Sequence, residues 1–200
     1  MYLHIKRALD FILAGLALVV LSPVLLVIAI LIRATSPGPV FFRQKRVGIH
    51  KTHFMIYKFR TMRTEAPKDQ PTHLLQNPAA FITPIGRFLR AYSLDELPQL
   101  LNIVKGEMSI VGPRPALWNQ DDLIAARDEV RANDVRPGLT GWAQINGRDE
   151  LPIPVKARLD GEYVARMSFA FDVRCVLGTV LSVARHDGVR EGTQEAEKHD

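Results

Sequence analysis

The feature that most constrains the fold is an uncharged run of twenty-two residues from Phe11 to Ile32. As a helix, this run would be about 33 Å long, enough to cross the hydrocarbon core of a bilayer. A cleaved signal peptide does not fit, because the apolar stretch is too long and no small-x-small site follows it. The run therefore predicts a membrane anchor, with Asp10 spared burial by a position at the membrane surface.

Ser22 and Pro23 lie at the midpoint of this run. Proline removes a helical hydrogen bond, although spanning helices tolerate the kink when a hydroxyl group satisfies the freed backbone. Two arrangements follow: one kinked helix that crosses the membrane, or two half-helices that enter one leaflet and return. Lys6, Arg7 and Arg33 flank both ends, which would keep both ends cytoplasmic. Because two basic residues form a weak signal, the residues alone favour the spanning helix slightly.

The composition suits one domain with its own core, since 47% of the 200 residues are apolar and 24% are charged. The single cysteine, Cys175, excludes an internal disulfide and fits a reducing compartment. A net charge of +5 indicates anionic partners. We find no zinc finger, RNA-binding signature or long basic block, so nucleic acid is not expected as a partner.

Beyond a turn at 36–39, the apolar patterns predict an α+β, mostly helical chain with a small antiparallel β-hairpin. The strands of the hairpin are expected at 40–43 and 54–60. The segment 64–78 is expected to be a loop. Helices are expected at 84–92, 97–104, 121–133, 157–165 and 171–184.

The segment 90–100, RAYSLDELPQL, combines a helix start with two adjacent carboxylates. Ser93 and Glu96 have the spacing of a capping box, and Asp95 is the alternative cap. Either frame places Asp95 and Glu96 at a helix N-terminus, where free N–H groups keep a carboxylate ionised and can receive a phosphate. The competing interpretation is that these residues do no more than cap a helix.

Two further segments hold arginines on a constrained backbone. Arg114 lies between prolines in Gly112-Pro113-Arg114-Pro115, and bidentate phosphate binding needs a guanidinium held in this way. A surface turn is the alternative. The segment 136–148 packs three glycines and two arginines, Arg136 and Arg148, into thirteen residues. We expect a shaped loop whose backbone approaches a ligand.

Together these motifs resemble the bacterial sugar transferases, in particular the small monotopic phosphoglycosyl transferases. The likeness runs from about residue 1 to 190 and makes the chain similar to the minimal members that transfer bacillosamine phosphate to undecaprenyl phosphate. In chain order, the motifs are KRxxDF at 6–11, SP at 22–23, YKFRTM at 57–62, RxxSLDELPQL at 90–100, GPRP at 112–115, RPGLTG at 136–141 and NGR at 146–148.

The resemblance implies transfer of a sugar 1-phosphate from a UDP-sugar, expected to be N-acetylated, to a polyprenyl phosphate, expected to be undecaprenyl phosphate, with release of UMP. Asp95 would be the nucleophile of a covalent aspartyl-phosphosugar intermediate, and Glu96 a ligand of Mg²⁺. Two of the basic residues would be structural and pair with Asp160 or Asp172. The expected phosphate and uridine contacts are Lys58, Arg60, Arg90, Arg114, Arg136 and Arg148.

The resemblance also implies a re-entrant membrane segment that turns at Ser22-Pro23, in place of the spanning helix. Residues 1–35 would form this helix-break-helix, 36–190 a catalytic domain on the cytoplasmic face of the inner membrane, and 191–200 a disordered tail. Membrane lipid is then a partner, and a homo-oligomer is allowed. Two alternatives stay open: a transferase of the bare sugar, which would release UDP, and a non-catalytic membrane-anchored adaptor of polysaccharide assembly.

Overall fold

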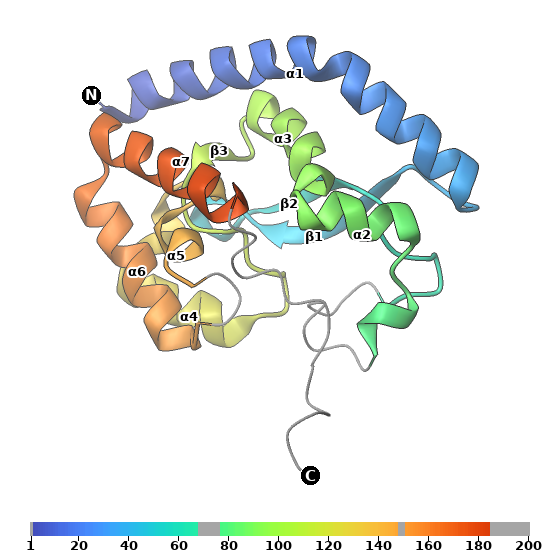
Figure 1. Cartoon of the computed structure of the whole chain (residues 1–200). Helices are drawn as coiled ribbons and strands as arrows, with labels where there is room; N and C mark the ends of the chain where they lie inside the picture. The colour runs from blue at the N-terminus through green and yellow to red at the C-terminus, as the bar shows by residue number, and fades with distance from the viewer. Residues whose placement is uncertain (1, 68–76, 148–150, 185–200) are drawn as a thin grey trace.

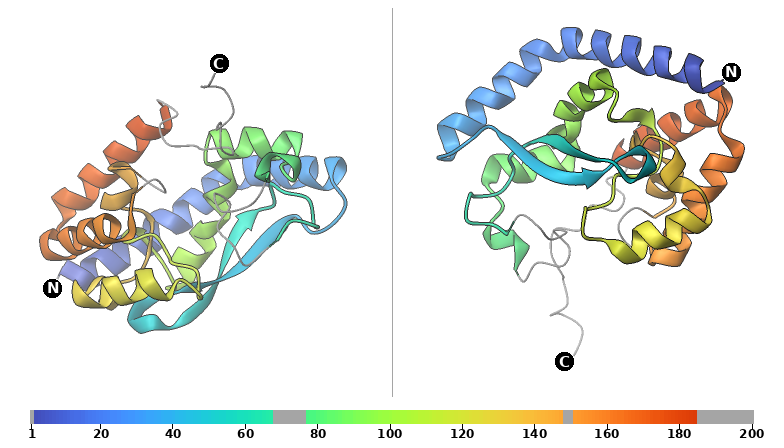
Figure 2. Two further views of the ribbon diagram at one scale, coloured as in Figure 1. Left: turned by 90° about the horizontal axis from the view of Figure 1, so that it is seen from below. Right: turned by 180° about the vertical axis from the view of Figure 1, so that it is seen from behind.

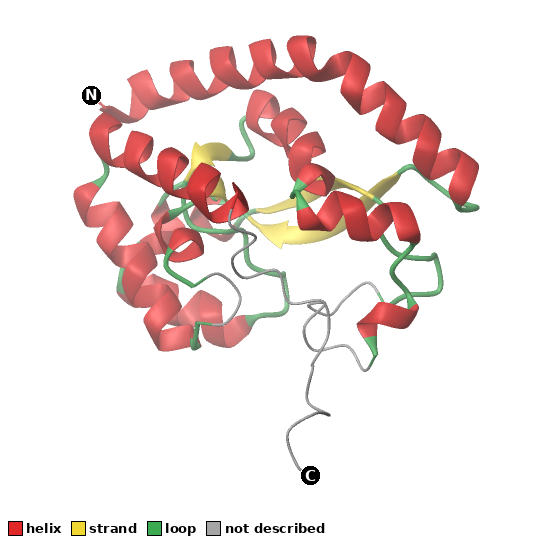
Figure 3. Cartoon of the chain, viewed as in Figure 1, coloured by secondary structure: helices red, strands yellow, loops and turns green. Residues whose placement is uncertain are grey.

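The computed structural model of the chain describes residues 2–67, 77–147 and 151–184 (Figure 1). The tail expected at 191–200 and most of the loop expected at 64–78 lie outside these residues. Helices dominate the described chain (Figure 3). They are α1 (Tyr2–Thr35), α2 (Pro84–Ala91), α3 (Leu100–Lys105), α4 (Asp121–Glu129), α5 (Trp142–Ile145), α6 (Ile153–Arg166) and α7 (Phe169–Ala184), with short 3₁₀ turns η1 (Ile49–Lys51), η3 (Pro78–Ala80), η4 (Leu94–Gln99) and η5 (Ala132–Asp134).

The predicted β-hairpin is confirmed. Strands β1 (Phe41–Val47) and β2 (His53–Phe59) pair antiparallel, with Phe41 opposite Phe59 and Val47 opposite His53. The hairpin lies beneath α1, and its turn reaches the segment that follows α4 (Figure 2). The strand pair therefore lies on the same side of α1 as α2 and α3, which contact this helix directly.

A second, parallel pair of strands was not predicted. Strands β3 (Ser109–Val111) and β4 (Gly138–Thr140) pair with Ser109 opposite Gly138. A Cβ atom on Gly138 would lie 2.1 Å from the backbone nitrogen of Gly112. The glycines of this segment therefore let two backbones approach each other, so the close approach that we expected toward a ligand is here made to the protein's own chain.

Helix α1 is continuous over 34 residues and bends near its middle, where Pro23 lies (Figure 1). The hydroxyl group of Ser22 donates a hydrogen bond of 2.7 Å to the carbonyl oxygen of Val19. This carbonyl is the one that Pro23, four residues later, leaves without its helical donor. The expected interruption at Ser22-Pro23 thus takes the form of a bend within one hydrogen-bonded helix.

The inner face of α1 is part of the protein core. Ala14 packs in one cluster with residues of β2 and α3, among them Ile56 and Ile103. Ile28 and Ile32 pack in another cluster with Phe59 and Leu89. Residues 1–35 and the remainder of the chain therefore share two hydrophobic clusters.

The outer face of α1 is apolar and exposed. Within the described residues, α1 is the one helix long and apolar enough to cross a membrane. A contiguous apolar surface of this kind marks contact with lipid or protein. Its exposed large side chains include Phe11, Ile12, Leu16, Val19, Val20, Val27 and Ile30.

The N-terminal end of α1 is tied to the domain by buried polar bonds. Lys6 Nζ lies 2.5 Å from Asp172 Oδ2, a carboxylate on α7. The Asp10 carboxylate accepts hydrogen bonds from Ser109 Oγ at 2.6 Å and from the Ile110 backbone N–H at 3.1 Å. Asp10 was expected at the membrane surface, but it is 4% exposed and satisfied by protein donors.

The C-terminal end of α1 is tied to the same domain. The Arg60 guanidinium, at the end of β2, donates to the carbonyl oxygens of Ser36 and Pro37, directly after the helix. Both ends of α1 are thus bonded to one domain while its middle bends across the face of that domain (Figure 1).

The bond between Lys6 and Asp172 predicts a large effect on stability. Asp172→Ala leaves the buried Lys6 ammonium with only the Asp10 carboxylate, at 4.0 Å, which should lower the free energy of unfolding by about 3–5 kcal/mol. Thermal unfolding in detergent measures the change. Asp134→Ala, at an exposed ion pair with Arg131, is the control and should cost no more than about 1 kcal/mol. Equal losses for the two variants would contradict a role for this bond in docking α1.

Candidate active site

The two adjacent carboxylates lie in the first turn of η4, as either capping frame required. The capping box itself is wrong, because Ser93 has a left-handed backbone (φ 55°) and its side chain makes no cap hydrogen bond. Its backbone N–H instead donates to the carbonyl oxygen of Arg90, which closes the turn that follows α2. A left-handed non-glycine residue costs about 1–2 kcal/mol, so backbone strain is stored two residues before Asp95.

Glu96 is held by two cations. Its Oε1 atom accepts hydrogen bonds from Lys58 Nζ and from Arg114 Nη2, both at 2.7 Å. Burial of Glu96 by itself would raise its pKa, but Arg114 and Lys58 outweigh burial and hold the pKa well below its usual range. Glu96 is therefore a fixed anion at the meeting point of β2, η4 and the loop before α4.

Asp95 has the opposite environment. It is 9% exposed, and no described residue donates a hydrogen bond to its carboxylate. Burial raises the pKa of Asp95, and the neighbouring charge of Glu96 adds to the rise, whereas Lys58, Arg90 and Arg114 oppose it. The ionised carboxylate of Asp95 is thus less stabilised than an ordinary aspartate.

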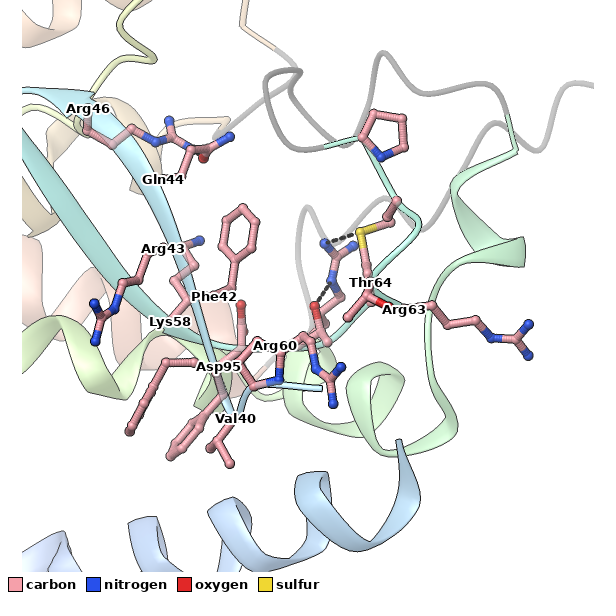
Figure 4. Close-up of a pocket in the computed structure, with 18 residues that line it drawn as sticks. Val40, Phe42, Arg43, Gln44, Arg46, Lys58, Arg60, Arg63, Thr64 and Asp95 are labelled. Atoms are coloured by element: carbon pink, nitrogen blue, oxygen red, sulfur yellow. Dashed lines mark hydrogen bonds between the residues drawn. The ribbon is translucent and has the colours of Figure 1, made fainter. Parts of the chain in front are cut away.

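Asp95 points into a cavity of about 480 Å³ beside the hairpin (Figure 4). The wall is formed by β1, the end of β2 and the segment that follows β2. Six of its 18 lining residues are basic and one, Asp95, is acidic, so the charge of the cavity favours an anionic ligand. Its basic lining residues are Arg43, Arg46, Lys58, Arg60, Arg63 and Arg90.

The structure divides the six predicted basic residues into groups. Lys58 and Arg114 contact Glu96, and Arg90 lines the cavity while its Nε donates to Thr61 Oγ1 at 3.0 Å. Arg60 also lines the cavity, but its terminal nitrogens bind backbone carbonyls at the end of α1. Four of the six predicted basic residues therefore contact Glu96 or line the cavity.

Of the remaining two basic residues, Arg136 does not line the cavity. Arg136 Nε donates to the carbonyl oxygen of Gly106 at 2.8 Å, beyond the end of α3, and Arg148 lies outside the described residues. The expected pairing of basic site residues with Asp160 or Asp172 is wrong. Asp160 pairs with Arg127, and Asp172 pairs with Lys6.

The cavity also contains residues that the motifs did not single out. Phe42, Gln44 and Arg46 of β1 line it. Alternation along a strand would have grouped these three on one face, but the expected strand at 40–43 was too short to show it. The signal was therefore present in the sequence and was lost with the strand boundary.

The comparisons with known proteins identify the family of the chain. A family model described as "Bacterial sugar transferase" matches residues 1–186. The chain is 40% identical to the "Uncharacterized sugar transferase EpsL" of Bacillus subtilis over 187 residues, which cover 94% of this chain and 91% of EpsL. The chain therefore belongs to the bacterial sugar transferase family.

Two relatives have names that specify a reaction. The UDP-glucose:undecaprenyl-phosphate glucose-1-phosphate transferase of Escherichia coli is 42% identical over 88% of this chain and 39% of its own length. The UDP-N-acetylgalactosamine-undecaprenyl-phosphate N-acetylgalactosaminephosphotransferase of Aeromonas hydrophila is 35% identical over 94% of this chain and 46% of its own length. The chain spans less than half of each of these two. Both names describe phosphoglycosyl transfer, so the expected class of enzyme is confirmed.

The pKa of Asp95 is raised and that of Glu96 is lowered, so replacing each carboxylate by its amide should have opposite effects on stability. Because the pKa of Asp95 is raised in the folded protein, its ionised form destabilises the fold above the unfolded value of about 3.9. Asp95→Asn should therefore raise the unfolding temperature at pH 7, and the gain should vanish as the pH falls below about 4.

Glu96→Gln should do the reverse. A lowered pKa contributes stability above the unfolded value of about 4.3 that is lost as the pH falls. Removing the charge should cost about 1–3 kcal/mol at pH 7 and less in acid. Scanning fluorimetry in detergent without divalent cations, from pH 3 to 8, measures both variants. A lower unfolding temperature for Asp95→Asn at pH 7 would count against a destabilised carboxylate.

Proposed function

We propose that the chain transfers a sugar 1-phosphate from a UDP-sugar to undecaprenyl phosphate and releases UMP, through a covalent intermediate on Asp95. The observation that carries the proposal is the difference between two neighbouring carboxylates. Glu96 is held by Lys58 and Arg114, whereas Asp95 faces a cationic cavity without a hydrogen-bond donor in the described chain. A carboxylate with little stabilisation of its charge is suited to nucleophilic attack.

The proposed reaction has two displacements. An oxygen of Asp95 attacks the β-phosphorus of the donor, the bond to the bridging oxygen breaks, and the electron pair leaves with UMP. An oxygen of undecaprenyl phosphate then attacks the same phosphorus, and the electron pair returns to the Asp95 carboxylate. Lys58, Arg90 and Arg114 lie close enough to influence the charge of Asp95, so they can also offset the charge on the phosphoryl oxygens.

We also propose that Mg²⁺ is held by Glu96 together with substrate phosphates. Among the described residues, no cluster of three or more His, Cys, Asp or Glu side chains could bind a metal. Mg²⁺ accepts such a site, because it is often held by one or two carboxylates and the phosphates themselves. Glu96 Oε2 has one contact, at 3.4 Å from Arg114, so this oxygen fits the role. The bound ion would neutralise phosphate charge.

The identity of the sugar is a separate part of the proposal. An N-acetylated donor is supported by the relative named for N-acetylgalactosamine, and glucose by the relative named for that sugar. Release of UMP from a panel of UDP-sugars identifies the substrate. Release of UDP would instead indicate transfer of the bare sugar.

We propose that α1 lies within one leaflet of the inner membrane, with the domain on the cytoplasmic face. A helix that crossed the bilayer would carry one end away from the domain, but both ends of α1 are bonded to it. The exposed apolar face of α1 suits immersion in lipid, and its basic flanks suit the cytoplasmic side. This position holds the cavity near the depth of a lipid phosphate.

Intact mass spectrometry tests the covalent step. Wild-type protein with a UDP-sugar and Mg²⁺, but without acceptor, should gain the mass of one phosphosugar and release UMP. Asp95→Asn should gain no mass and lose at least about 10³-fold in turnover, because no other carboxylate replaces the nucleophile. EDTA should prevent the adduct. A fully active Asp95→Asn enzyme would rule out this residue as the nucleophile.

Labelling of single cysteines tests the membrane arrangement. Leu3→Cys and Ala34→Cys place thiols at exposed positions near the two ends of α1. In inverted membrane vesicles, both should react with an impermeant maleimide, because both ends face the cytoplasmic side. Cys175 is fully buried and serves as the unlabelled background. Reaction of the two thiols from opposite sides would restore the spanning helix.

A further inference from the structure

One wall of the cavity is formed by alternate residues of β1. Phe42, Gln44 and Arg46 all line the cavity, and Gln44 Oε1 accepts a hydrogen bond of 2.5 Å from Arg46 Nη2. Arg43 also lines the cavity, but its guanidinium lies over Tyr57. The Lys45 ammonium lies over Trp118, and Lys45 is not a lining residue. Because successive side chains of a strand point to opposite faces, the cavity receives a ring, an amide and a guanidinium in a row.

The ring of Phe42 lies next to the charged end of the site. Phe42 is directly opposite Lys58 in the hairpin, and Lys58 holds Glu96. Figure 4 shows the Phe42 ring between Asp95 and the Gln44 and Arg46 pair. A ligand with its phosphates at Asp95 and Lys58 would therefore extend along β1 and meet this ring.

The core does not account for Phe42. The ring is only half-buried, and it belongs to none of the hydrophobic clusters of the described chain. The other two aromatic residues of the lining, Phe41 and Phe59, stack on each other with centroids 5.6 Å apart. Phe42 is thus the aromatic residue of the lining whose ring is left to face a ligand.

We infer that Phe42 is the platform on which the uracil ring of the donor stacks, with Gln44 and Arg46 facing the edge of the base. This inference rests on the proposed function, because it assumes a UDP-sugar. The charge of the cavity assigns the diphosphate to the end near Lys58 and Arg90, which leaves the flat uncharged base for the exposed ring. A sugar ring could also pack on Phe42, so the experiment must separate the two parts of the donor.

Calorimetry with the full chain in detergent provides this separation. Loss of a stacked aromatic side chain should weaken UMP binding to Phe42→Leu by about tenfold or more, whereas Phe42→Trp should bind about as tightly as wild type. Binding of pyrophosphate, which has no base, should be unchanged in both variants. Phe88→Leu, at an exposed position of α2 outside the cavity, is the matched control and should bind UMP like wild type.

Other outcomes overturn the inference in distinguishable ways. Unchanged UMP binding with a raised KM for the UDP-sugar would assign the ring to the sugar, and an equal loss of UMP and pyrophosphate would indicate general distortion of the cavity. Wild-type protein that neither binds UMP nor turns over any UDP-sugar would refute the proposed function itself. Saturation-transfer signals at the uracil H5 and H6 protons that disappear in Phe42→Leu would agree with stacking.

Discussion

The site depends on the clamp that Lys58 and Arg114 form on Glu96. The three residues come from β2, η4 and the loop that follows β3, so one set of charge-assisted hydrogen bonds joins three parts of the chain. With the clamp in place, the two adjacent carboxylates have opposite shifts in pKa. Lys58 and Arg114 donate hydrogen bonds to Glu96, whereas they act on Asp95 only through their charge. The same two side chains thus fix the geometry of the site and hold the charge of Glu96, while burial raises the pKa of the neighbouring Asp95.

The membrane helix and the site are parts of one structure. Arg60 lines the cavity and at the same time binds the backbone at the end of α1. At the other end, Asp10 of α1 accepts a hydrogen bond from Ser109 of β3, which lies five residues before Arg114, the residue that binds Glu96. The position of α1 on the domain and the position of the cations in the site are therefore set together.

Local signals predicted much of this arrangement. The hairpin, α2 and the position of Asp95 and Glu96 at a helix start follow from apolar alternation and helix-start chemistry over a few residues. Long-range partners could not be predicted in the same way. Arg60 and Arg136 carry the same positive charge as Arg114, but they bind backbone carbonyls and not a carboxylate. No residue near them in the sequence indicates these carbonyl partners. The β3 and β4 pair was not predicted because its glycines give no alternation of apolar and polar residues. The capping box was wrong because the turn after α2 holds Ser93 in a left-handed backbone conformation.

Because α1 and the hairpin share hydrophobic clusters, α1 can be neither cut off nor replaced without loss of the core. A protease cut after residue 35 would not release a water-soluble catalyst, because Phe59, Leu89 and Ile103 would lose the helix that covers them. Nor could a generic anchor from another protein be grafted in its place. The helix is here a part of the hydrophobic core, so it cannot be removed while that core stays intact.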